Sequence, residues 1–183
     1  MVAPAQSLNF PERFIRALSV IDPRPDQHFL EIGCGTGILA GMIADKLHTG
    51  RITALDKSPV MIQKACARNQ QHIASSRLQL LSGDIKDRNF VHRSFDAIIA
   101  FNVNFFQKSH PQILALQDAL RPSGSLYIFQ QDPPGRDNHT IPAIERTISE
   151  CGFLIQKKEC HELRPSPVYA IIATAVPGKY SMP

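Results

Sequence analysis

The chain has 183 residues, of which 43% are hydrophobic, and its formal net charge is +4. This length suits one α/β domain, so we expect residues 1–183 to form a single domain, with a lid helix segment at 1–24 and a core at 25–183. No run approaches the roughly 20 consecutive apolar residues of a membrane span. The first residues lack a basic cluster followed by an apolar core, which argues against a secretory signal.

The cysteines and the charges narrow the class of protein further. Cys34, Cys66, Cys151 and Cys160 show neither CxxC spacing nor a regular framework. This pattern indicates reduced thiols in a cytoplasmic chain, with no disulfide scaffold and no metal site. The basic residues are interleaved with acids, as in "DIKDR" at 84–88, which is typical of a solvated surface and does not favour a nucleic-acid partner.

Apolar periodicity predicts strands and helices that alternate along the chain. The predicted helices cover residues 10–21, 37–47, 58–69, 111–120 and 141–151. The predicted strands cover residues 28–32, 51–56, 78–84, 95–101, 125–129, 153–162 and 168–176, with a turn at 121–124 before the fifth. The last two strands have no helix between them and must form an antiparallel hairpin. We therefore expect a Rossmann-like, mostly parallel sheet of seven strands, with helices on both faces and an antiparallel C-terminal strand.

Three glycines, Gly33, Gly35 and Gly37, follow the first predicted strand in "EIGCGTG" at 31–37. A strand, a glycine-rich turn and a helix form the usual place where an open α/β sheet holds a nucleotide-like ligand. Gly33 and Gly35 would let ligand atoms reach the main chain, and Gly37 would let the helix begin close to the strand. Taken alone, the turn fits close packing as well as ligand binding.

Two acids end the next two predicted strands. Asp56 is placed to accept hydrogen bonds from both hydroxyls of a ribose. Asp84 is placed to accept a bond from an adenine amino group, while the Ile85 amide donates to a ring nitrogen. Either acid alone is also typical of a turn or a helix cap. Because both stand at the ends of strands that follow the glycine turn, together they predict a nucleoside pocket.

The spacing of the glycines distinguishes between ligands. A dinucleotide turn, G-x-G-x-x-G, would place its third glycine at position 38, which is Ile38. Glu31 precedes the first glycine, near the helix start where a pyrophosphate would bind. A carboxylate faces an ammonium or a sulfonium better than a phosphate. The predicted ligand is therefore a nucleoside that carries positive charge.

Five segments together resemble the successive motifs of class I S-adenosylmethionine-dependent methyltransferases, in particular the small type-11 or UbiE-like group. They are "FLEIGCGTGILA", "ALDKSPVMIQKA", "LSGD", "FDAIIAFNV" and "LRPSGSLYIF", within about residues 28–130. The resemblance implies S-adenosylmethionine as the cofactor. It implies these contacts: Glu31 near the ammonium, Gly33, Cys34, Gly35 and Gly37 along the methionine portion and the turn, Asp56 on the ribose, Lys57 and Met61 beside the adenine, Asp84 and Ile85 at the adenine edge, and Phe101, Asn102 and Val103 over the sulfonium.

The methyl acceptor is less defined by the sequence. A base is needed only for a nucleophile that keeps its proton at neutral pH, so no catalytic residue is assigned. The candidate substrate contacts are the loop and strand-end residues Asn104, Phe105, Asp132, His139 and Tyr169. Each of them also fits as an ordinary turn, packing or loop residue. "DPP" at 132–134 follows the fifth predicted strand rather than the fourth, which argues against methylation of a base amino group.

We therefore expect an S-adenosylmethionine-dependent methyltransferase that acts on a small molecule, with a lid that a homodimer could share. Three alternatives stay open. The chain could be a non-catalytic protein that binds S-adenosylmethionine as a partner subunit. It could methylate RNA or protein, or it could be a nicotinamide-dependent oxidoreductase, which Ile38 disfavours.

Overall fold

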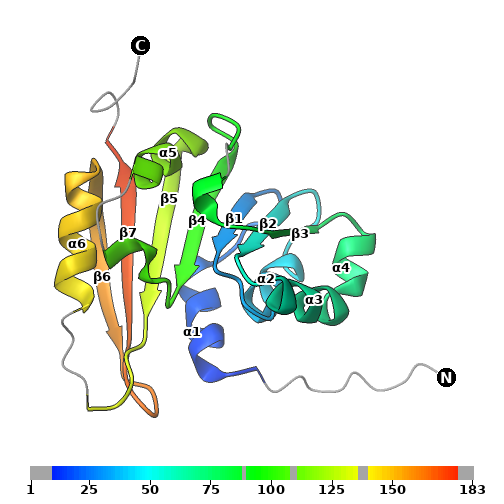
Figure 1. Cartoon of the computed structure of the whole chain (residues 1–183), viewed down its shortest axis with the longest axis horizontal. Helices are drawn as coiled ribbons and strands as arrows, with labels where there is room; N and C mark the ends of the chain where they lie inside the picture. Colours follow the sequence, from blue (N-terminus) through cyan, green and yellow to red (C-terminus); the bar gives the residue numbers. More distant parts are fainter. Residues whose placement is uncertain (1–9, 88–89, 108–110, 136–139, 177–183) are drawn as a thin grey trace.

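The computed structural model describes residues 10–87, 90–107, 111–135 and 140–176, which build one sheet flanked by helices (Figure 1). The strands are β1 His28–Ile32, β2 Arg51–Asp56, β3 Leu78–Ser82, β4 Phe95–Phe101, β5 Leu120–Gln130, β6 Phe153–His161 and β7 Val168–Ala175. The helices are α1 Glu12–Ile21, α2 Ile38–Ala44, α3 Pro59–Arg68, α4 Gln70–Ala74, α5 Pro111–Ala119 and α6 Thr140–Glu150. Two 3₁₀ turns are η1 Ile85–Asp87 and η2 Asn104–Gln107.

The order of the strands places a crevice in the middle of the sheet. The sheet reads β3-β2-β1-β4-β5-β7-β6, and β1 to β5 pair in parallel. β7 runs antiparallel to both β5 and β6, so the predicted mostly parallel sheet with its closing hairpin is confirmed. The order reverses between β1 and β4, because β2 and β3 lie to one side of β1 and the later strands to the other. Open α/β sheets bind ligands at such a reversal.

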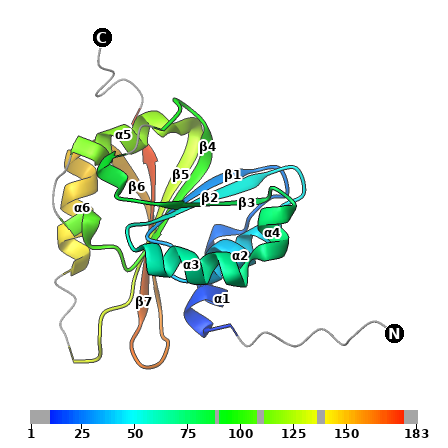
Figure 2. The same cartoon turned by 45° about the vertical axis from the view of Figure 1, so that its right-hand side comes forward.

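Helices cover both faces of the sheet, as Figure 2 shows. Two hydrophobic clusters fill the space between the helices and the strands, and the central strands contribute to both. Phe29 belongs to the cluster under α1 and α2, whereas its neighbour Leu30 belongs to the cluster under α5 and α6. Burial on both faces explains why the parallel strands are nearly continuous apolar runs. None of the helices in the described residues is both long and apolar enough to cross a membrane.

The helix expected to form a lid is anchored in the core. Ala17 and Ile21 of α1 are buried in the cluster that also contains α2. The ring of Phe14 packs edge-on against Phe101 at the end of β4, with 5.2 Å between the centroids. Such aromatic pairs contribute about 0.5–1.5 kcal/mol beyond the burial of their surface. α1 is therefore held against the sheet near the ends of its central strands.

The prediction of a turn at 121–124 is wrong, because β5 begins at Leu120. Leu120 pairs with Phe95 of β4, and the register then shifts before Ala97. Arg121 donates to both carboxylate oxygens of Asp96 at 2.7 and 2.8 Å. This ion pair holds the start of β5 beside β4 although the sequence "RPSG" is typical of a turn.

The helix predicted over residues 58–69 ends at Arg68, and the short helix α4 was not predicted. Ser58 caps α3 as expected, since its hydroxyl accepts a bond from the Met61 amide at 3.4 Å. Asn69 separates the two helices with φ −112° and ψ 26°. The chain thus changes direction at Asn69 without a glycine or proline to signal the break.

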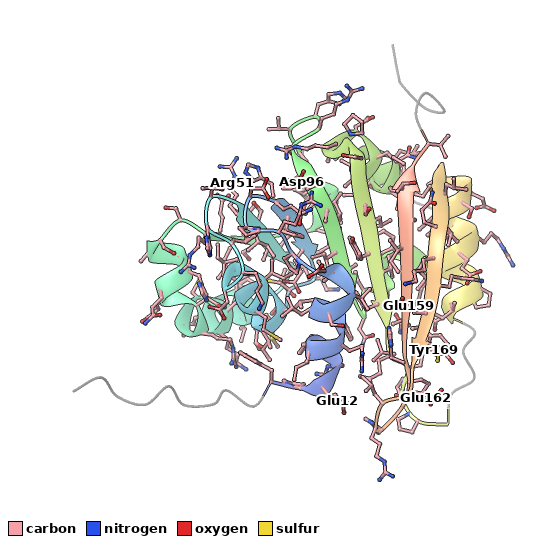
Figure 3. The ribbon with its side chains drawn as sticks, turned by 180° about the vertical axis from the view of Figure 1, so that it is seen from behind. Glu12, Arg51, Asp96, Glu159, Glu162 and Tyr169 are labelled. Carbon is pink, nitrogen blue, oxygen red and sulfur yellow. The ribbon has the colours of Figure 1, made fainter. Side chains whose placement is uncertain are left out.

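Asp96 connects three strands at the end of the sheet opposite the crevice. Its carboxylate accepts from the main-chain N–H of His28 at 2.7 Å as well as from Arg121. Figure 3 shows Asp96 close to Arg51 at this end, far from Tyr169 at the other end. Burial lowers the pKa of His28, and the positive charges of Arg51 and Arg121 lower it further.

We expect Asp96→Ala to lower the free energy of unfolding by about 1–3 kcal/mol, because the His28 amide and Arg121 lose their acceptor. Urea denaturation measures the change. Asp45→Ala is the control, since Asp45 pairs with His72 while its side chain is 59% exposed, and exposed pairs contribute about 0–1 kcal/mol. Equal losses in the two variants would show that Asp96 does not stabilise the ends of the strands.

Candidate functional site

The loop after β1 is built on three glycines in the left-handed region. Gly33, Gly35 and Gly37 have φ of 72°, 53° and 69°. At Gly33, a Cβ would lie 2.7 Å from Cγ2 of Val103, which follows β4. At Gly35, a Cβ would meet nothing within 4 Å. The loop therefore passes close to the end of β4 at its first glycine and borders open space at its second.

The end of β2 holds this loop in place. The amides of Gly33 and Cys34 donate to the Leu55 carbonyl at 2.7 and 3.0 Å. The amide of Gly35 donates to Oδ2 of Asp56 at 2.8 Å. These bonds account for three consecutive amides of the loop and leave none of the three turned toward the adjacent space as a free donor.

The carboxylate of Asp56 can accept more hydrogen bonds than it does in this structure. Its Oδ2 accepts from Gly35, and its Oδ1 accepts from the amide of Ser58 at 2.9 Å. A carboxylate offers about four lone-pair sites, so each oxygen retains one further acceptor direction. The side chain is half-buried and lines a pocket.

That pocket, about 550 Å³ in volume, opens at the carboxyl ends of β1, β2, β3 and β4. Most of its lining was predicted from the sequence: Gly33, Asp56, Lys57, Asp84, Ile85, Asn102, Val103, Asn104 and Phe105. The topology therefore brings together residues that are as far apart in the chain as Gly33 and Phe105. Two carboxylates and one ammonium are the charged groups among the described residues that line the pocket.

Asn102 lines the pocket, but its side-chain oxygen is hydrogen-bonded to the residue that follows β5. It has φ 54°, a conformation that Asn tolerates better than most residues. Its main-chain amide donates to the Phe129 carbonyl at 2.9 Å. Its Oδ1 accepts from the amide of Gln131 at 2.7 Å. Asn102 therefore joins the ends of β4 and β5.

Several predicted cofactor residues do not line the pocket. Cys34 and Phe101 are 7% and 8% exposed and belong to the hydrophobic cluster under α1 and α2. Burial raises the pKa of the Cys34 thiol, which makes it an inert packing group. Phe101 stacks on Phe129 at 5.7 Å between centroids. The others outside the lining are Glu31, Gly35, Gly37 and Met61.

Glu31 is a buried acid beneath the glycine loop. Its side chain points toward α2, where it accepts a hydrogen bond from the Ala40 amide, and its Oε2 has no partner among the residues that the structure describes. It pairs in the sheet with Ala54 and Ile99, so its strand neighbours are uncharged. Burial raises the pKa of Glu31 to about 8, and the negative charge of Asp56 adds to this effect. The carboxyl is therefore largely protonated at neutral pH.

The predicted substrate residues divide into two groups. Asn104 and Phe105 line the pocket. Asp132 lies beyond β5 and accepts at Oδ1 from Gln130 at 2.6 Å, and Tyr169 pairs with Gln130 across the sheet. Neither Asp132 nor Tyr169 is in the pocket lining. His139 lies outside the described residues.

Sequence reasoning missed three lining residues, Ile32, Leu55 and Gly83. Ile32 and Leu55 are the apolar residues at the ends of β1 and β2, where an apolar strand end gives no ligand signal. Gly83 has φ 142°, and its amide donates to the Asp56 carbonyl at 3.0 Å. Its place directly before Asp84 in "SGD" is the signal that could have identified it.

Comparisons with known proteins agree with this geometry. A family model described as a methyltransferase domain matches residues 29–124. Malonyl-[acyl-carrier protein] O-methyltransferase of Priestia megaterium is 38% identical over 99 residues, which are 53% of this chain and 34% of the relative. Trans-aconitate 2-methyltransferase of Deinococcus radiodurans is 30% identical over 141 residues, which are 76% of this chain and 50% of the relative.

The chain thus spans about a third to a half of the length of these curated relatives. Among solved structures, an S-adenosylmethionine-dependent methyltransferase of Aquifex aeolicus superposes with a TM-score of 0.73 at 15% identity, over 92% of this chain and 95% of the other. That likeness shows the fold. Because the family model matches more than half of the residues, the chain belongs to the family of S-adenosylmethionine-dependent methyltransferases.

Proposed function

We propose that this chain transfers a methyl group from S-adenosylmethionine to a small molecule. The observation that supports this most directly is the convergence of Gly33, Asp56 and Asp84 on one pocket at the sheet reversal. Its volume of about 550 Å³ lies within the roughly 300–1,000 Å³ of small-molecule sites. The Deinococcus relative, whose name gives trans-aconitate as its substrate, supports a small acceptor.

The residues present fit the cofactor. Asp56 retains two acceptor directions after its bonds to Gly35 and Ser58, which suits two ribose hydroxyls. Asp84 and the Ile85 amide would take the adenine edge, since both line the same pocket. The open space beside Gly35 would take the methionine portion, because a side chain there would project into it. In this arrangement Lys57, which lines the same pocket, would lie beside the adenine.

When bound, S-adenosylmethionine supplies an activated methyl group on a sulfonium, so the protein needs chiefly to align the acceptor and exclude water. Phe105 and Asn104 of η2 would border the acceptor, because they line the pocket directly after β4. Among the described residues that line the pocket, none is His, Cys or Tyr. We therefore assign no catalytic base.

Glu31 would respond to the positive charge of the cofactor without lining the pocket. Glu31 lies in β1, two residues before Gly33, and its buried Oε2 has no partner among the described residues. A cation nearby favours the ionised form of a carboxyl, whereas burial favours the neutral form. The contact between Glu31 and the ammonium stays a prediction. The proton that burial keeps on Glu31 is testable in the unliganded chain.

We expect Asp56→Ala to weaken binding of S-adenosylhomocysteine by about 1–3 kcal/mol in isothermal titration calorimetry, because ribose hydroxyls lose a charged acceptor. The loss of the bond to the Gly35 amide adds to this effect. The control is Asp87→Ala, since Asp87 is an exposed acid of η1. An unchanged affinity in Asp56→Ala would refute the ribose assignment.

Glu31 should make stability depend on pH. In the unfolded chain it ionises near 4.5, and in the folded chain near 8. Between these values the folded state holds a proton that the unfolded state has released. The free energy of unfolding therefore falls as the pH rises, by up to about 1.4 kcal/mol per pH unit.

Urea denaturation of wild type and Glu31→Gln at pH 5.5, 6.5 and 7.5 isolates this contribution. Glutamine cannot ionise, and other titrating groups affect both proteins alike. Wild type should lose stability relative to the variant as the pH rises. Parallel pH dependences would mean that Glu31 is already ionised in the folded chain.

The activity itself is tested by incubating the purified chain with S-adenosylmethionine and separate panels of small carboxylic acids, phenols and amines, of tRNA, and of proteins. We expect S-adenosylhomocysteine to form with at least one small acceptor. Cofactor binding without product in every panel would favour a non-catalytic binding protein. Turnover only with tRNA or protein would overturn the small-molecule assignment, and binding of NAD in place of S-adenosylmethionine would overturn the cofactor.

A further inference from the structure

Asn69 is a buried polar residue that the pocket does not include. It separates α3 from α4 and is 3% exposed. Its main-chain amide donates to the Ala65 carbonyl at 3.0 Å, and its carbonyl accepts from the Ile73 amide at 3.0 Å. Its backbone thus ends one helix and begins the next. The side chain remains available for a different role.

The side-chain amide of Asn69 reaches the glycine loop. Its Nδ2 donates to the Gly37 carbonyl at 3.0 Å and to the Ala65 carbonyl at 2.9 Å. An amide nitrogen has two hydrogens, so both of its donors are used. One bond lies within α3 and the other crosses to α2. Asn69 therefore links the end of α3 to the residue at which the glycine loop becomes a helix.

Two glycines make room for this link. At Gly37, a Cβ would lie 2.8 Å from Nδ2 of Asn69 and 2.9 Å from Cβ of Ala65. At Gly41, one helical turn later, a Cβ would lie 2.3 Å from Oδ1 of Asn69. Since residues i and i+4 lie on the same face of a helix, the two glycines form a notch that holds the amide.

The carbonyl of Gly37 accepts from Asn69 and also from the Gly41 amide at 3.1 Å. These two bonds fix the last peptide of the loop, whereas Leu55 and Asp56 fix its first amides. Leu55 and Asp56 line the pocket, and Asn69 lies behind the loop. The loop is thus held from both sides.

We propose that Asn69 is a positioning residue, which fixes the exit of the glycine loop and thereby strengthens cofactor binding without contacting the cofactor. The inference rests on the proposed function, because it takes the loop as the cofactor site. Asn69 would not be identified from the residues that contact the ligand, because it lies outside the pocket lining.

The main test compares Asn69→Ala and Asn69→Asp with wild type. The first removes the amide, and the second keeps its shape but removes both donors. Each should raise the Kd for S-adenosylhomocysteine about tenfold in calorimetry performed well below its melting temperature. Thr147→Ala is the matched control, because Thr147 is a buried polar residue of α6, 5% exposed. It should lower the melting temperature and leave the Kd unchanged.

Gly41→Ala provides a second variant. Its methyl group would displace the Asn69 amide, so it should also raise the Kd although alanine favours helix formation. In the Asn69→Ala background the same change should leave the Kd unchanged. Additive effects of the two substitutions would contradict the linkage, because they would place Gly41 and Asn69 on separate routes to the pocket.

Hydrogen exchange of the unliganded chain separates this inference from the proposed function. The amides of Gly35 and Gly37 should exchange faster in Asn69→Ala than in Thr147→Ala. If wild type binds no S-adenosylhomocysteine, the proposed function fails, and the exchange rates still decide whether Asn69 fixes the loop. The inference would be overturned if both Asn69 variants had the same Kd and the same exchange rates as wild type. If neither variant folds, Asn69→Ser, with a shorter donor, takes their place in both measurements.

Discussion

The hydrogen bond from the Gly35 amide to the Asp56 carboxylate is the contact on which the site depends. It joins the turn after β1 to the end of β2, and it directs one oxygen of the acid at the loop. It adds to the bonds with Leu55 and Asn69 that hold three left-handed glycines in one conformation. The same carboxylate that would bind ribose therefore also shapes the loop beside it. One side chain thus holds the loop and, in the proposed function, binds the ligand.

The glycines serve different purposes, although the sequence presents them as one cluster. Gly33 is bare because Val103 lies against it, and Gly37 and Gly41 are bare because Asn69 and Ala65 pack there. Of these four glycines, Gly35 is the one at which a Cβ would meet no atom of the described residues within 4 Å. The cluster is thus mostly a consequence of close packing between loop, helix and strand. Gly33 also lines the pocket, so close packing and access to the pocket occur in the same turn, which is why a glycine-rich turn by itself was a weak signal.

The family of the chain, the mostly parallel sheet of seven strands and most of the pocket lining could be predicted from the sequence. Asp56, Asp84 and Asn102 were placed correctly at the rim because strand ends are visible as the ends of apolar runs, and parallel strands end at one edge. The start of β5 was missed because the pairing of Arg121 with Asp96 joins residues 25 positions apart. α4 was missed because no glycine or proline marks the break at Asn69. The role of the Asn69 amide was missed because its partner, Gly37, lies 32 positions earlier.

The sequence by itself determined which residues reach the rim, since this depends only on where each strand ends. The tertiary structure decided what each of them does there. Glu31 accepts a hydrogen bond from the Ala40 amide of α2, and Cys34 and Phe101 are packed in the core. The side-chain oxygen of Asn102 accepts from the Gln131 amide. A polar side chain forms hydrogen bonds with the groups that folding brings close to it, and these groups come from segments remote in sequence. The local sequence pattern determines where a residue stands along its strand. The neighbours that the fold brings to it determine which way its side chain points.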